Sequence, residues 1–104
     1  MCGFVGFASN QKQFECEWIL RGNEKIINRG PDASGVWFSK NKNIGLAHRR
    51  LSILDLSKLA NQPMFDQQKN ICIVYNGEIY NYKFLRNELE KKGEIFYTES
   101  DTEV

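Results

Sequence analysis

The residue best suited to covalent chemistry is a cysteine at the second position. Removal of Met1 would leave Cys2 with both a thiol and a free α-amino group. An α-amine titrates at about 7.7–8.0, so near neutral pH it can act as a base for its own thiol, directly or through a water. Gly3 leaves room for a substrate beside the sulfur. Any chain that begins Met-Cys shares these features, so they identify no activity by themselves.

Attack of a thiolate on a carboxamide needs further groups, which stabilise the oxyanion and hold the charged end of the substrate. Asn76 and Gly77 follow an apolar run and can present a side-chain amide and a backbone N–H to one point. For a free amino acid, Arg50 can bind the carboxylate through a bidentate fork, and Asp101 can pair with the ammonium. Spacing along the chain does not show whether these four positions converge.

The elements that must position these residues follow both strand and helix patterns. A first helix is predicted from Glu15 to about Asn28, because apolar residues recur at helical spacing, and a second helix is predicted to end at Gly93. A capping-box pattern at residues 100–103 predicts a further helix that continues past Val104. The predicted strands cover residues 2–8, 36–39, 44–51, 71–75 (central and buried) and 95–97. The apolar stripe of the first predicted helix is Phe14, Trp18, Ile19, Gly22 and Ile26. The apolar stripe of the second predicted helix is Tyr82, Leu85 and Leu89.

Composition narrows the function classes. The 104 residues are 41% hydrophobic and 26% charged with a net charge of +1, which fits one soluble globular domain and gives no field to attract nucleic acid or a membrane surface. Neither a secretory signal nor a membrane-spanning run is present, so we expect a cytoplasmic location. Three widely spaced cysteines and one histidine argue against a disulfide framework and against a metal site.

Six sequence blocks together resemble a known family. In this order and spacing they are similar to the class II glutamine amidotransferase domain, with an N-terminal nucleophile, of glutamine-hydrolysing asparagine synthetases. Two of them, "HRRLSILDLS" and "YNGEIYN", favour the asparagine synthetase branch over the sugar-phosphate and nucleotide-pathway amidotransferases. The blocks are Met-Cys-Gly at the start, "RGPDASG" at 29–35, "LAHRRLSILDLS" at 46–57, "QPM" at 62–64, "YNGEIYNY" at 75–82 and "SDTEV" at 100–104.

The resemblance implies a role for each matched position. Cys2, freed of Met1, would be both nucleophile and base, and Asn76 with the Gly77 N–H would form the oxyanion hole. The family favours Arg50 over its neighbour Arg49 for the glutamine carboxylate. The glutamine-binding residues implied in this way are Arg50, Leu51, Ser52, Ile53, Leu54, Asn76, Gly77, Glu78 and Asp101.

The resemblance also implies a fold and partners. The expected fold is α+β, a four-layer α/β/β/α sandwich of N-terminal nucleophile hydrolases, with residues 1–104 supplying only its N-terminal part. Open sheet edges would then leave the fragment poorly stable alone. L-glutamine is the implied substrate. ATP and Mg²⁺ would act in a synthetase domain absent from this chain, which uses ammonia to amidate aspartate, and the parent protein is expected to form a homodimer.

Other interpretations remain open. The ammonia acceptor could instead be a sugar in surface-polysaccharide synthesis, or the chain could be an inactive truncated remnant. His48 is predicted to be a satisfied structural residue, because the α-amine already fills the role of base. Cys72 is predicted to be a small core residue, and Cys16 is assigned no role.

Overall fold

A three-stranded antiparallel sheet and one helix form the better packed part of the molecule. The computed structural model describes residues 1–10 and 15–104, so Phe14 of the predicted first stripe lies outside the described residues. The sheet has the order β1-β3-β2, with β3 in the centre. Its strands are β1 (Gly3–Ala8), β2 (Ala33–Phe38) and β3 (Ile44–Arg50), and its helix is α1 (Cys16–Lys25), followed by the 3-10 turn Ile27–Arg29.

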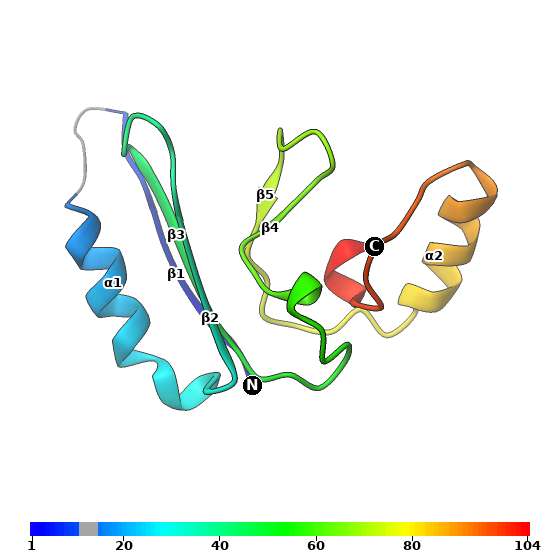
Figure 1. Cartoon of the computed structure of the whole chain (residues 1–104), viewed down its shortest axis with the longest axis horizontal. Helices are drawn as coiled ribbons and strands as arrows, with labels where there is room; N and C mark the ends of the chain where they lie inside the picture. The colour runs from blue at the N-terminus through cyan, green and yellow to red at the C-terminus, as the bar shows by residue number, and fades with distance from the viewer. Residues whose placement is uncertain (11–14) are drawn as a thin grey trace.

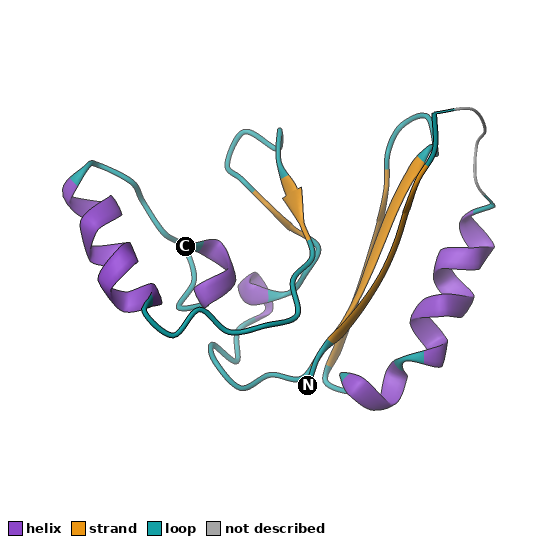
Figure 2. Cartoon of the chain, turned by 180° about the vertical axis from the view of Figure 1, so that it is seen from behind, coloured by secondary structure: helices purple, strands orange, loops and turns teal. Residues whose placement is uncertain are grey.

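Helix α1 covers one face of this sheet (Figures 1 and 2). Ile19 and Ala47 are the most deeply buried apolar residues there. Gly22 permits the close approach, because a Cβ at that position would lie 3.1 Å from the side chain of Val5. The Asn23 side chain donates a 2.8 Å hydrogen bond to the hydroxyl of Ser34, which fixes the helix along the strand direction.

The opposite face of the sheet meets a short hairpin made of β4 (Met64–Phe65) and β5 (Cys72–Ile73). The rings of Trp37 and Phe65 pack edge to face across this junction, with their centroids 6.0 Å apart. Figure 1 shows α1, the three-stranded sheet, the hairpin and α2 (Tyr82–Lys91) in this order along the longest axis. The molecule is therefore α+β with antiparallel sheets, while the complete four-layer sandwich stays a prediction.

A glycine in β2 lets the chain cross from one sheet to the other. A Cβ on Gly35 would lie only 1.9 Å from the carbonyl oxygen of Gln62, which is backbone and cannot rotate away. We expect Gly35→Ala to lower the free energy of unfolding by about 1–3 kcal/mol, because overpacking forces a backbone shift. Urea unfolding followed by circular dichroism measures this change. Gly6→Ala is the control: its Cβ would meet a Leu46 methyl group at 3.0 Å, and its smaller cost should leave it the more stable variant.

Two predicted strands are wrong. The predicted buried strand 71–75 is only the two-residue β5, and Ile71 and Ile73 are 66% and 40% exposed. Residues 95–97 form no strand, and the Tyr97 N–H donates instead to the carboxylate of Glu103 at 2.8 Å. Strand β5 pairs only with β4 in the described part of the chain, so its other edge has no strand partner there.

The helix ends follow their sequence signals more closely. Gly93 adopts a φ of +97° directly after α2, and the N–H groups of Gly93 and Glu94 bond the carbonyls of Glu90 and Leu89. This is the predicted glycine cap in the Schellman arrangement. Residues 101–103 form a 3-10 turn, which Ser100 caps by accepting from the Thr102 N–H. No helix in the ranges 1–10 and 15–104 has the length and apolar character needed to cross a membrane.

Candidate active site

A pocket of about 310 Å³ opens beside the N-terminus and collects nearly all of the predicted site residues. Four segments that lie far apart in sequence form its wall. Of the predicted residues, only Ser52 does not line it. The lining residues are Met1, Cys2, Arg50, Leu51, Ile53, Leu54, Ala60, Gln62, Tyr75, Asn76, Gly77, Glu78, Tyr80, Ser100, Asp101 and Thr102.

Antiparallel pairing of β1 with β3 places the cysteine in this pocket. Gly3 lies opposite Arg49, so Cys2 is level with Arg50 at the end of β3, and its sulfur contacts the next residue, Leu51. The Leu51 N–H donates to the sulfur of Cys2 at 3.3 Å, and the thiol lies 3.6 Å from the Leu51 carbonyl oxygen. A backbone donor aimed at sulfur can stabilise negative charge on it. Arg29 holds the same residue through a 3.0 Å bond from Nε to the Cys2 carbonyl.

The Arg-Gly-Pro-Asp segment supports the residues that follow β3. Gly30 lies so close to β3 that a Cβ would be 2.3 Å from the backbone of Arg49. The Asp32 N–H donates to the Arg50 carbonyl at 3.0 Å, and the Asp32 carboxylate accepts from the Ser52 N–H at 2.7 Å. Ser52 is thus tied to this supporting segment, which explains its absence from the pocket lining. Asp32 was not predicted as a site residue.

The guanidinium of Arg50 donates hydrogen bonds to the loop after β3. Its two terminal nitrogens donate to the carbonyls of Leu54, Asp55 and Ser57 and to the side chain of Asn61. An arginine has five N–H donors, so these four bonds leave a single N–H, on Nε, for a ligand. The bidentate fork that we predicted for the glutamine carboxylate is not available in this arrangement.

The neighbouring arginine faces the other way. Arg49 points toward α1 and donates from Nε to the Asn23 carbonyl at 3.1 Å. Arg50 is buried, with only 7% of its surface exposed, and that small exposed part lines the pocket. Alternation along β3 therefore assigns Arg50 to the pocket and Arg49 to the helix.

Asn76 and Gly77 are exposed at the pocket edge. Within the described chain the Asn76 side chain makes no hydrogen bond, so its amide is free to donate to a ligand. The ring of Tyr75 folds back over Gly77, and a Cβ there would lie 2.4 Å from the tyrosine hydroxyl. Glycine at 77 is what allows this close approach.

Asp101 is buried at the opposite side of the pocket. One carboxylate oxygen accepts from the Ile79 N–H at 2.9 Å, which joins the 3-10 turn to the segment after Gly77. The other oxygen has no hydrogen-bond partner among the described residues and can accept from an ammonium group. This geometry makes Asp101 the nearest candidate for the positive end of an amino acid.

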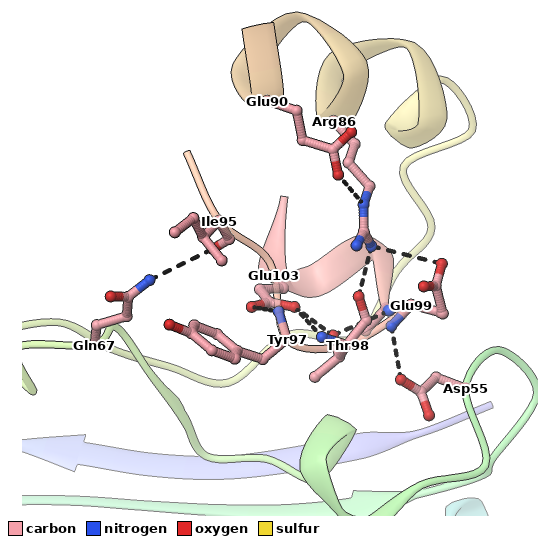
Figure 3. Close-up of polar contacts among 10 residues, drawn as sticks. Asp55, Gln67, Arg86, Glu90, Ile95, Tyr97, Thr98, Glu99 and Glu103 are labelled. Carbon is pink, nitrogen blue, oxygen red and sulfur yellow. Dashed lines mark hydrogen bonds and ion pairs between the residues drawn. The ribbon is translucent and has the colours of Figure 1, made fainter. Parts of the chain in front are cut away.

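A polar network holds the turn that carries Asp101 (Figure 3). Glu103 accepts from the N–H and the hydroxyl of Thr98 at 2.7 and 2.6 Å. Arg86 of α2 donates to the Thr98 carbonyl at 2.5 Å and pairs with Glu90 and Glu99. In the predicted capping box the Glu103 carboxylate would accept from the Ser100 N–H. In the structure it accepts from residues 97 and 98 instead, and the Ser100 N–H donates to the Thr98 hydroxyl.

Asp55 connects the loop after β3 to this network. Its carboxylate accepts from the Ser57 N–H at 2.8 Å and from the Glu99 N–H at 2.7 Å. Hydrogen bonds from the Ser57 side chain and from these two N–H groups hold the pKa of Asp55 below its ordinary value. The residue stays ionised at neutral pH and keeps the loop after β3 fixed to the segment before Asp101. No sequence motif had indicated this role.

The remaining titratable candidates lie outside the pocket lining. His48 is deeply buried, and burial is the main cause that lowers its pKa. Burial also raises the pKa of the Cys72 thiol, which makes that cysteine a poor nucleophile. Cys72 is half-buried in the hairpin rather than in a central strand, and Cys16 is half-buried at the start of α1. Across the described residues, no group of three or more His, Cys, Asp or Glu side chains could hold a metal ion.

The pocket thus brings together the Cys2 thiol, the Asn76 amide, the Gly77 backbone and the Asp101 carboxylate. Comparison with known proteins gives the family. The chain belongs to the glutamine amidotransferase family, since the model of the glutamine amidotransferase domain matches residues 1–104.

Curated relatives support the same family. The chain is 44% identical to asparagine synthetase [glutamine-hydrolyzing] 1 of Bacillus subtilis (strain 168) and 42% identical to putative asparagine synthetase [glutamine-hydrolyzing] 2 of Methanocaldococcus jannaschii. It is also 39% identical to amidase chry2 of Gibberella zeae. Each alignment covers 100% of this chain but only 17%, 23% and 17% of the respective relative. The chain therefore spans about a fifth of the length of the relatives it matches.

Proposed function

We propose that this chain carries the glutaminase site of an asparagine synthetase and hydrolyses L-glutamine to glutamate and ammonia. The observation that carries the proposal is the meeting of Cys2, Asn76, Gly77 and Asp101 in one pocket. These residues supply a nucleophile, two oxyanion donors and an acceptor for the substrate ammonium. Pocket size agrees, because about 310 Å³ suits a small amino acid.

The first half of the reaction forms a thioester. The freed α-amine of Cys2 takes the thiol proton, and the thiolate attacks the carboxamide carbon of glutamine. The carbonyl oxygen becomes an oxyanion, which accepts from the Asn76 side chain and the Gly77 N–H. The α-ammonium then protonates the amide nitrogen, the C–N bond breaks, and ammonia leaves a γ-glutamyl thioester on Cys2.

The second half restores the enzyme. The α-amine takes a proton from water, whose oxygen attacks the thioester carbon, and the same donors stabilise the second oxyanion. The C–S bond breaks, the α-ammonium returns its proton to the departing sulfur, and glutamate leaves. In our proposal Asp101 binds the substrate ammonium with Glu78 beside it, the Nε–H of Arg50 binds the carboxylate, and the segment Leu51–Leu54 forms the wall beneath the side chain.

The activity proposed for the whole protein is amidation of aspartate with this ammonia. That step would need ATP and Mg²⁺, which we assign to a synthetase domain beyond the matched fifth of the relatives. We also propose that the whole protein is a homodimer in the cytoplasm and that it binds neither nucleic acid nor a membrane.

A different acceptor is the second candidate. The similarity to a protein called amidase chry2 is nearly as high as that to the asparagine synthetases. Nothing in the pocket selects the ammonia acceptor, because the acceptor does not enter the glutaminase reaction. The partner domain, rather than the residues discussed here, would decide between aspartate and another acceptor such as a sugar.

The direct test is an assay of the protein that carries this chain, with its N-terminus checked by mass spectrometry. We expect stoichiometric glutamate and ammonia from L-glutamine, and far less product from L-asparagine, whose carboxamide is one methylene closer to the groups that Asp101 and Arg50 would hold. A protein with a free N-terminal cysteine and no glutaminase activity would refute the proposal.

A further inference from the structure

The residue before the two oxyanion donors is held by side chains on both sides of its backbone. The Tyr75 N–H donates to Oε1 of Gln62 at 2.5 Å, and the Tyr75 carbonyl lies 3.1 Å from Nε2 of His48. Strand β5 ends at Ile73, so sheet pairing does not reach this point in the described structure. Two side chains therefore fix the peptide units that lead into Asn76.

The surroundings of Gln62 hold its side chain in one position. It is 8% exposed, and its backbone is pressed against β2 at Gly35. The second end of its amide, Nε2, donates to the hydroxyl of Thr102 at 3.3 Å. Thr102 follows Asp101 directly, so one amide group joins the segment that carries the oxyanion donors to the turn that carries the carboxylate.

His48 supports the same residue from within the sheet. It is 1% exposed, and burial lowers its pKa, so the ring is neutral near pH 7. A carbonyl oxygen only accepts, which requires the proton of the neutral ring to be on Nε2. Nδ1 has no partner among the described residues, so the contact to Tyr75 is the one polar bond of this ring.

We propose that Gln62 and His48 are positioning residues, which aim Asn76 and Gly77 at the oxyanion by fixing both backbone groups of Tyr75. The inference rests on the glutaminase function proposed above. Oxyanion donors act in the transition state, and a displacement of about 1 Å in such a group can cost roughly 10²-fold in rate. Neither residue touches the reacting atoms, so their effect should fall on kcat.

Gln62→Met tests this directly, because methionine keeps the length and most of the volume while removing both hydrogen bonds. We expect kcat for ammonia release to fall about 10- to 100-fold, with the KM for glutamine changed less than about threefold. Gln62→Glu keeps an acceptor for the Tyr75 N–H, and the Thr102 hydroxyl can turn to donate to it. That variant should recover most of the lost kcat. Gln68→Met, on the exposed hairpin turn, is the matched control.

A second measurement separates positioning from general damage. Alkylation of Cys2 by iodoacetamide forms no oxyanion, so its rate should stay at the wild-type value in Gln62→Met. Equal losses of alkylation and ammonia release, or a wild-type kcat in Gln62→Met, would overturn the inference and leave the glutaminase function standing. If Gln62→Met does not fold, His48→Phe removes the other contact to Tyr75 while keeping an aromatic ring, and an unchanged kcat there overturns the inference equally. A wild-type protein that releases no ammonia removes both proposals.

Discussion

Cys2→Ala is expected to abolish ammonia release from glutamine, with a loss of roughly 10⁴-fold or more. Alanine removes the sulfur that forms the thioester while keeping the α-amine, Gly3 and the strand that follows. No other cysteine can replace it, since Cys16 and Cys72 lie outside the pocket lining. The measurement is the initial rate of ammonia formation at saturating glutamine.

Two matched variants control this result. Cys16→Ala and Cys72→Ala each remove one half-buried thiol and should keep the wild-type rate within about twofold, because neither contacts the pocket. Incubation with diazo-oxo-norleucine adds a second readout, as the wild-type protein should gain one covalent adduct and Cys2→Ala none. Undiminished glutaminase activity in Cys2→Ala would remove the central claim of the proposed mechanism.

Local signals in the sequence predicted much of the fold. Strands β1 and β3 and both helices lie within a few residues of the predicted ranges, and Gly93 ends α2 as predicted. These features depend on the spacing of apolar residues and on a glycine that can adopt a positive φ, and both can be seen in the sequence. The strands predicted at 71–75 and 95–97 depend on partners, and the described chain supplies one short partner to the first and none to the second.

The candidate site shows the same division. All the site residues that the resemblance named, apart from Ser52, line the pocket, but the resemblance could not show what each side chain contacts. The fork predicted for Arg50 stays a prediction, and in this structure loop carbonyls, which a motif does not reveal, occupy its terminal nitrogens. Gln62 stood in the quoted block "QPM" without a role, and its function emerges only from its contacts with Tyr75 and Thr102.

Asn76→Ala is expected to lower kcat by about 10²–10³-fold, equivalent to roughly 2.7–4 kcal/mol of transition-state stabilisation. The side-chain amide is free among the described residues and lies at the edge of the pocket that contains the cysteine. Its donor gains strength only when the carbonyl oxygen becomes negative, so the KM for glutamine should change less than about threefold. The Gly77 N–H remains in the variant and accounts for a residual rate above that of Cys2→Ala.

The choice of control decides how this result is interpreted. Asn81→Ala removes an exposed asparagine five residues along the chain, whose side chain does not cap α2, and it should leave both kinetic constants unchanged. Iodoacetamide should alkylate Cys2 in Asn76→Ala at the wild-type rate, because that reaction develops no oxyanion. A rise in KM with an unchanged kcat would instead make Asn76 a ground-state binding residue. The oxyanion would then depend on Gly77 alone, and the pairing of a side-chain donor with a backbone donor proposed for this pocket would be wrong.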